Sequence, residues 1–123
     1  MNNSYSKLNV LGKPLEECSR NPLTGWFRDG FCRTDENDSG SHVVCALITN
    51  DFLLFTKKMG NDLISKTSYF PGLKEGDYWC VCALRWLEAY NYDRKIAPKI
   101  RLESTSIAAL NYIPYNVLYQ YRI

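Results

Sequence analysis

The stretch VVCALITNDFLLFTKKMG, residues 43–60, decides the fold class of this chain. Residues 43–48 are apolar at every position, which is typical of a strand that is covered on both faces. Thr49 can cap a helix over residues 50–59, because its hydroxyl can accept a free N–H of the first turn. Apolar side chains recur on one face of that helix, at Phe52, Phe55 and Met59. A buried strand followed at once by an amphipathic helix predicts a sheet with helices packed on it.

The rest of the chain predicts one more buried strand, one ambiguous segment and further helices. The segment 78–94 fits either a single helix or a short buried strand over 79–83 followed by a helix over 85–92, and we favour the second. A second buried strand is expected near 99–104, and helical patterns follow near 106–121. The predicted class is therefore α+β, a single compact domain with a small mixed sheet.

Composition and charge exclude several classes of protein. The chain has 123 residues, of which 46% are hydrophobic and 23% charged, and its net charge of +2 does not indicate nucleic-acid binding. The polar start has no apolar run typical of a secretory signal, and no apolar run is long enough to span a membrane. We therefore expect a soluble, cytoplasmic protein with no membrane partner. Residues 1–6 are expected to be disordered and residues 7–123 to form the single domain.

Cysteines suggest zinc as the cofactor to test. In the cytosol the five cysteines should be reduced, as thiols or metal ligands, because disulfides are rare there. Structural zinc sites typically have pairs of cysteines with two to four residues between them, and this chain has no such pair, since only Val81 stands between Cys80 and Cys82. Cysteine is also common in protein cores as a small apolar residue. The candidate metal ligands are Cys18, Cys32, His42, Cys45, Cys80 and Cys82.

The single histidine, His42, is the centre of the catalytic candidates. A catalytic thiolate needs a base within hydrogen-bond reach, so Cys32 and Cys45 are candidate nucleophiles and Asp29 a candidate partner of the ring. Because His42 stands where a polar loop enters an apolar strand, we expect its ring to contact one of three groups. These are Asp29, Asp38 and Ser41, with the Arg28–Asp29 turn nearby.

The loops supply candidate ligand-binding residues, because loops on a rigid scaffold often carry function. These candidates are Arg28, Asp29, Asn61, Asp62 and Trp79. The expected function is that of a small ligand-binding or structural domain with a small-molecule or protein partner. The alternative is a Cys/His zinc protein or a small thiol-dependent enzyme that uses His42 with a nearby cysteine.

A series of segments in fixed order adds a family resemblance. The chain resembles the small bacterial and plant family catalogued as domain of unknown function 2237. The resemblance implies a single soluble domain with no assigned activity, substrate or cofactor. The family pattern also tends to have a histidine after a threonine where this chain has Thr105-Ser106. The segments are NVLGKPLEEC (9–18), PLTGWFRDGFC (22–32), GSHVVCALIT (40–49), GNDL (60–63) and FPGLKEGDYWCVCALRW (70–86).

Overall fold

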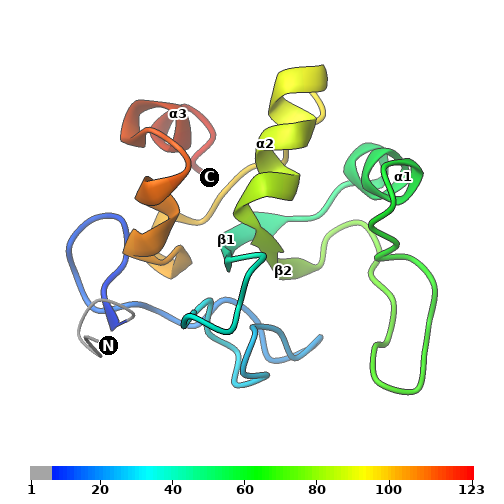
Figure 1. Cartoon of the computed structure of the whole chain (residues 1–123), viewed down its shortest axis with the longest axis horizontal. Helices are drawn as coiled ribbons and strands as arrows, with labels where there is room; N and C mark the ends of the chain where they lie inside the picture. The colour runs from blue at the N-terminus through cyan, green and yellow to red at the C-terminus, as the bar shows by residue number, and fades with distance from the viewer. Residues whose placement is uncertain (1–6) are drawn as a thin grey trace.

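The structure is a computed structural model that describes residues 7–123 (Figure 1), so the expected disordered segment 1–6 lies outside the described residues. Helices and strands are mixed, which confirms the predicted α+β class. No helix in the described range has the length and hydropathy needed to cross a membrane. In chain order the elements are β1 (His42–Leu47), α1 (Asn50–Lys58), β2 (Tyr78–Cys82), α2 (Ala83–Tyr92), the 3-10 helices η2 (Leu102–Ser104) and η3 (Ile107–Asn111), and α3 (Tyr115–Gln120).

The two strands form an antiparallel sheet at the centre of the molecule. The register places His42 opposite Cys82 and Cys45 opposite Cys80, with a bulge between His42 and Val44. The four central residues of β1 are all buried, which confirms that this strand is covered on both faces. In Figure 1 the helices lie on one side of the strands and most of the chain between residues 7 and 41, in blue and cyan, lies on the other.

Helix α1 forms where its local sequence predicts it, within one residue at the end. The Thr49 hydroxyl accepts the Phe52 N–H at 3.2 Å, and Gly60 adopts a left-handed backbone with φ +97° just after the helix. Phe52 and Phe55 are buried in the core, as expected. The expectation for Met59 is wrong, because it stands one residue beyond the end of α1 and remains 45% exposed.

The ambiguous segment is a strand followed by a helix, as favoured from the sequence. β2 leads directly into α2, which places Cys82 at the junction. Helix α2 buries Trp86, whose indole N–H donates to the Pro98 carbonyl at 3.0 Å. This hydrogen bond satisfies the polar end of a side chain that is otherwise surrounded by the core.

The prediction of a strand over 99–104 is wrong. Ile100 is buried and forms isolated bridges with Ala46 and Arg122, but the chain then turns into η2. The physical reason lies in the hydroxyl residues that follow. Lys99 and Arg101 each make one backbone hydrogen bond with β1, but the Thr105 hydroxyl donates to the Arg101 carbonyl at 2.9 Å, which gives that carbonyl a local partner where a longer ladder would continue.

The sheet and the C-terminal helices also differ in detail from the prediction. The sheet is antiparallel rather than mixed, and the parallel bridge between Ile100 and Arg122 stands outside it. The helical region 106–121 consists of η3 and α3. Pro114 is the N-cap of α3, because it has no N–H to donate within the preceding helix.

Candidate functional site

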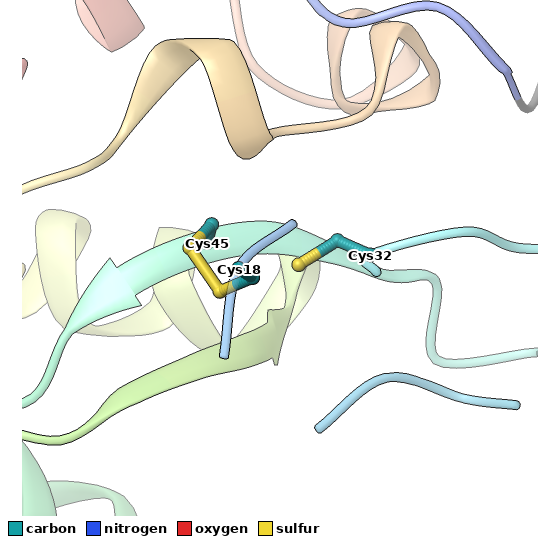
Figure 2. A group of neighbouring side chains, drawn as sticks. All are labelled: Cys18, Cys32 and Cys45. Carbon is teal, nitrogen blue, oxygen red and sulfur yellow. A yellow bond between two sulfur atoms is a disulfide. The ribbon is translucent and has the colours of Figure 1, made fainter. Parts of the chain in front are cut away.

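Two buried disulfides attach the N-terminal loops to the sheet. Cys18 is bonded to Cys45 and Cys32 to Cys80, with Cα–Cα distances of 5.7 Å and 5.3 Å. Cys45 and Cys80 are opposite each other on β1 and β2, so the two bridges are neighbours on one face of the sheet. Figure 2 shows the Cys18–Cys45 bond and the Cys32 sulfur beside it. The bridges hold loops that the sheet alone would not order.

The expectation of five reduced cysteines is therefore wrong for four of them. It follows that Cys32 and Cys45 are not the free nucleophiles expected from their closeness to His42 in sequence. The Sγ atoms of Cys18, Cys32 and Cys45 lie within 4.8 Å of one another, a spacing at which reduced sulfurs can hold a metal ion. Disulfides are typical of oxidising compartments, so they also remove the support for a cytoplasmic location.

His42 is held by one carboxylate. Its Nδ1 lies 2.7 Å from Asp38 Oδ1, and Asp38 Oδ2 accepts the His42 backbone N–H at 2.9 Å and the Thr34 hydroxyl at 3.0 Å. The Asp38 side chain is fully buried, whereas 36% of the His42 side chain is exposed. The expected contact between His42 and a carboxylate is confirmed, with Asp38 rather than Asp29 as the partner.

The backbone before β1 makes this contact possible. Ser41 has a left-handed backbone with φ +51°, and its carbonyl accepts the N–H groups of Val43 and Ala83. The bulge that follows disrupts the ladder between His42 and Val44. Bulges re-aim side chains at the ends of strands, and this one directs His42 back toward the loop that contains Asp38.

A cleft of about 440 Å³ opens beside His42, and we name it the Trp26–Trp79 cleft. It lies between the turn 25–28, the loop 62–70 and strand β2. The Trp26 ring is stacked on His42 with centroids 5.8 Å apart, and Phe70 packs edge-on against Trp79 at 5.2 Å. Its volume lies within the usual range for small-ligand pockets, and four large aromatic side chains, Trp26, Tyr69, Phe70 and Trp79, are part of its lining.

Arg28 is an exposed cation at this cleft. Its guanidinium lies 5.1 Å from the centroid of Trp79, and its Nη1 donates to the Gly25 carbonyl at 2.6 Å. The backbone of Arg28 has φ +53°, a left-handed conformation that is costly for residues with a Cβ. Within the described residues no carboxylate forms an ion pair with Arg28. The charge of Arg28 is therefore open to a partner from solution.

The loop after α1 closes the other side of the cleft. Asp62 lines it, but its carboxylate is engaged within the loop, where it accepts the N–H groups of Ile64 and Ser65 at 2.9 Å and 3.0 Å. Hydrogen bonds from the side chain and backbone of Ser65, and from the backbone of Ile64, lower the pKa of Asp62 to about 2. Asn61 donates to Thr56 at 3.0 Å, so it anchors the start of the loop to α1.

The structure separates the predicted site residues into four groups. Arg28, Asp62 and Trp79 line the Trp26–Trp79 cleft together with His42, while Asn61 and Cys82 lie around a neighbouring hollow. Asp29 is not part of this cleft, because it forms an ion pair with Arg33 instead. The remaining four candidates are the cysteines of the disulfides, Cys18, Cys32, Cys45 and Cys80, of which Cys80 also lines the cleft and the hollow.

Sequence reasoning missed Trp26 and Tyr69 as cleft residues. In the structure both side chains reach the surface, since Trp26 is 42% exposed and Tyr69 is 93% exposed. Large aromatic side chains at the surface often mark binding sites. An aromatic residue that fits no apolar stripe, beside a run of turn residues such as Gly25 and Gly30, is the feature that could have indicated them.

Comparison with known proteins shows the family to which this chain belongs. No curated protein matches the chain. A family model described as "Uncharacterized protein conserved in bacteria (DUF2237)" matches residues 8–122, and this description names no activity. Because the match covers nearly the whole chain, the earlier resemblance is confirmed, and the protein belongs to the DUF2237 family.

Proposed function

We propose that this protein binds a small anionic ligand with a planar apolar group in the Trp26–Trp79 cleft. The proposal rests on one observation about Arg28. This cation is stacked on Trp79 at the cleft and has no carboxylate partner in the described part of the chain. Arginine recognises carboxylates and phosphates through paired hydrogen bonds, so an anion is the partner that suits it.

The carboxylate and the imidazole at the cleft already have partners. The Asp62 carboxylate already accepts hydrogen bonds from its own loop, and the His42 Nδ1 is engaged by Asp38. Arg28 is therefore the charged group that gains most from a ligand. The aromatic walls supply the remaining affinity, because a flat apolar group can stack on Trp26 or Tyr69 and remove their exposed faces from water.

The backbone of Arg28 supports the same proposal. A left-handed conformation at a residue other than glycine costs about 1–3 kcal/mol and tends to occur at functional positions. The Nη1 bond to the Gly25 carbonyl also holds the guanidinium in place before a ligand arrives. Such preorganisation reduces the side-chain entropy that the guanidinium loses when a ligand binds.

Binding of phenylacetate, compared with its neutral amide phenylacetamide, tests the proposal by titration calorimetry. Phenylacetate should bind more tightly than the amide. Arg28→Gln should weaken phenylacetate binding by about 10- to 150-fold, which corresponds to a charge-assisted hydrogen bond of about 1.5–3 kcal/mol. The same substitution should leave binding of the amide nearly unchanged.

Arg94→Gln is the matched control for this experiment. Arg94 also lies over an aromatic ring, 5.0 Å from the centroid of Tyr90, but it does not line the cleft. Its replacement should leave phenylacetate binding unchanged. Equal affinity for the acid and the amide, or equal losses in the two variants, would contradict the proposal.

A second candidate function, zinc binding, is favoured by the spacing of the buried sulfurs. If the two disulfides are reduced, Cys18, Cys32 and Cys45 offer three thiolates within 4.8 Å of one another, with Cys80 as the fourth cysteine of the cluster. Zinc accepts four such ligands in structural sites. Metal analysis of untagged protein purified under reducing conditions tests this function. One zinc per chain would support it, and metal-free protein with four thiols that become reactive on denaturation would reject it.

A further inference from the structure

We infer that Cys82 is a thiol nucleophile, with His42 as its base and Asp38 as the residue that positions that base, and that it accepts an acyl group from an ester or thioester in the Trp26–Trp79 cleft. This inference rests on the proposed function in one respect, because it takes the cleft as the place where the ligand binds. It adds a covalent reaction to what was proposed as binding alone.

Cys82 is the one cysteine of the five that is free, and it is partly exposed. It stands directly opposite His42 in the register of the sheet. Both residues line a second hollow of about 270 Å³ that shares Trp26, His42 and Trp79 with the main cleft. A ligand in the cleft can therefore extend to the sulfur without crossing the core.

Gly40 shows how closely the two side chains approach. A Cβ at this position would lie 3.0 Å from His42 Cε1, 3.4 Å from Cys82 Sγ and 3.6 Å from His42 Nδ1, so the Nδ1–Cε1 edge of the ring and the sulfur border the same small space. The Cys82 thiol donates to the Gly40 carbonyl. The proposed reaction requires that rotation about the side-chain bonds of Cys82 turn that hydrogen from the carbonyl toward the ring. The lack of a side chain at Gly40 keeps the space between them open.

The Asp38 carboxylate decides which nitrogen of His42 can act as a base. Its Oδ1 accepts the hydrogen of Nδ1, so in the neutral ring Nε2 carries the free electron pair. Within residues 7–123 the ring makes no hydrogen bond through Nε2, and the side chain is partly exposed. Asp38 is itself held by the Thr34 hydroxyl and the His42 backbone N–H, which fixes the direction of its Oδ1. A base oriented by a third group is the arrangement that thiol nucleophiles require.

The start of α2 supplies donors for the charge that an acyl transfer creates. Helix α2 has ten residues and begins immediately after Cys82, and no side chain caps it. Ala83 donates its N–H to the Ser41 carbonyl, and the next N–H groups of the first turn have no acceptor within the helix. Backbone N–H groups at a helix N-terminus stabilise a developing oxyanion. This is why an acyl group, rather than another electrophile, suits the site.

The reaction balances without an oxidant or a reductant. The thiol proton passes to His42 Nε2 as the sulfur attacks the carbonyl carbon, and the π electron pair moves to the carbonyl oxygen. When the C=O bond re-forms, the bond to the alcohol or thiol leaving group breaks, and that group takes the proton from His42. Water then attacks the acylated Cys82 in the same way, releasing a carboxylic acid and the free thiol. One ester and one water thus give one acid and one alcohol or thiol.

Acetylation by 4-nitrophenyl acetate tests the inference on the intact chain under non-reducing conditions. Release of nitrophenolate should begin with a burst, and peptide mass analysis should place one acetyl group on Cys82. Cys82→Ala should abolish the burst. His42→Gln should slow acetylation by at least about 100-fold, the usual contribution of a general base.

Asp38→Asn separates a positioning role from a purely structural one. The asparagine oxygen can still accept from Thr34 and from the His42 backbone, but its NH₂ group must donate to Nδ1. The ring hydrogen should then move to Nε2, which ¹⁵N NMR of the imidazole detects directly, and acetylation should slow by at least about 10-fold in a chain that stays folded. Asp35→Asn is the control, because Asp35 accepts the Asn37 N–H in the same loop without contacting His42. It should change neither the tautomer nor the rate.

Several outcomes would overturn the inference. They are acetylation of Cys82 no faster than in denatured protein, acetylation mainly at other residues, or an unchanged rate in both His42→Gln and Asp38→Asn. Failure of the proposed function looks different, because 4-nitrophenyl acetate carries no anionic group for Arg28. Loss of phenylacetate binding with normal acetylation rejects the anionic ligand alone, whereas normal binding without acetylation rejects the nucleophile alone.

Discussion

Removal of one disulfide should destabilise the fold by an amount that follows from the length of the loop it closes. Cys18 and Cys45 are 27 residues apart in sequence, and Cys32 and Cys80 are 48 residues apart. In the chain-entropy model these loops correspond to about 3.5 and about 4 kcal/mol at 25 °C. The double variant Cys18→Ala/Cys45→Ala should therefore lose about 3.5 kcal/mol in its free energy of unfolding. The variant Cys32→Ala/Cys80→Ala should lose slightly more.

Urea unfolding under non-reducing conditions measures these losses. Cys82→Ala is the control, because Cys82 closes no loop, and it should change the free energy of unfolding by less than about 1 kcal/mol. Reductant should lower the stability of the unmodified chain by more than it lowers that of either double variant. If reductant has no effect and each double variant loses less than about 1 kcal/mol, the cysteines are not linked and the reasoning from loop entropy is refuted.

Two further predictions concern the core and the cleft. Phe55→Ala should lower the free energy of unfolding in urea by about 3–5 kcal/mol, because Phe55 is buried. Met59→Ala should lower it by less than about 1 kcal/mol, because Met59 is exposed. Equal losses would refute the assignment of the helix face. Ser65→Ala should raise the pKa of Asp62 from about 2 toward 3.8, as followed by NMR of the carboxyl carbon. A carboxyl group whose pKa is lowered in the folded state stabilises that state at pH values above its ordinary pKa, so the Asp62 contribution to stability should fade between about pH 4 and pH 2. An unchanged carboxyl titration in Ser65→Ala would argue against the Ser65 hydrogen bond.

Much of the fold follows from local patterns in the sequence. The strand over 43–48 and the helix over 50–59 are set by apolar spacing, by the Thr49 cap and by the backbone freedom of Gly60. These features act over a few residues, so they can be recognised without the rest of the chain. The pattern over 99–104 was misleading because Thr105 and its neighbours offer hydrogen bonds that compete with a ladder.

Less of the candidate site could be predicted. The single histidine at a loop–strand boundary indicated a partnered ring, and Asp38 was one of three expected partners. The burial of Asp38 was not apparent, because a carboxylate between Asp35 and Ser41 looks like part of a solvated loop. Its three hydrogen bonds, one to Thr34 in the loop and two to His42 at the start of β1, offset the cost of taking that charge out of water.

By itself the sequence determined β1 and α1, the single imidazole and the supply of five cysteines. The tertiary structure decided which cysteines pair and which one stays free, because Cys18 and Cys32 reach the sheet only through the path of long irregular loops. It also decided that His42 faces Cys82, since strand register joins residues 40 positions apart. Contacts of this kind depend on how distant segments pack, and the energy that selects them is distributed over the whole core rather than over any short stretch of sequence.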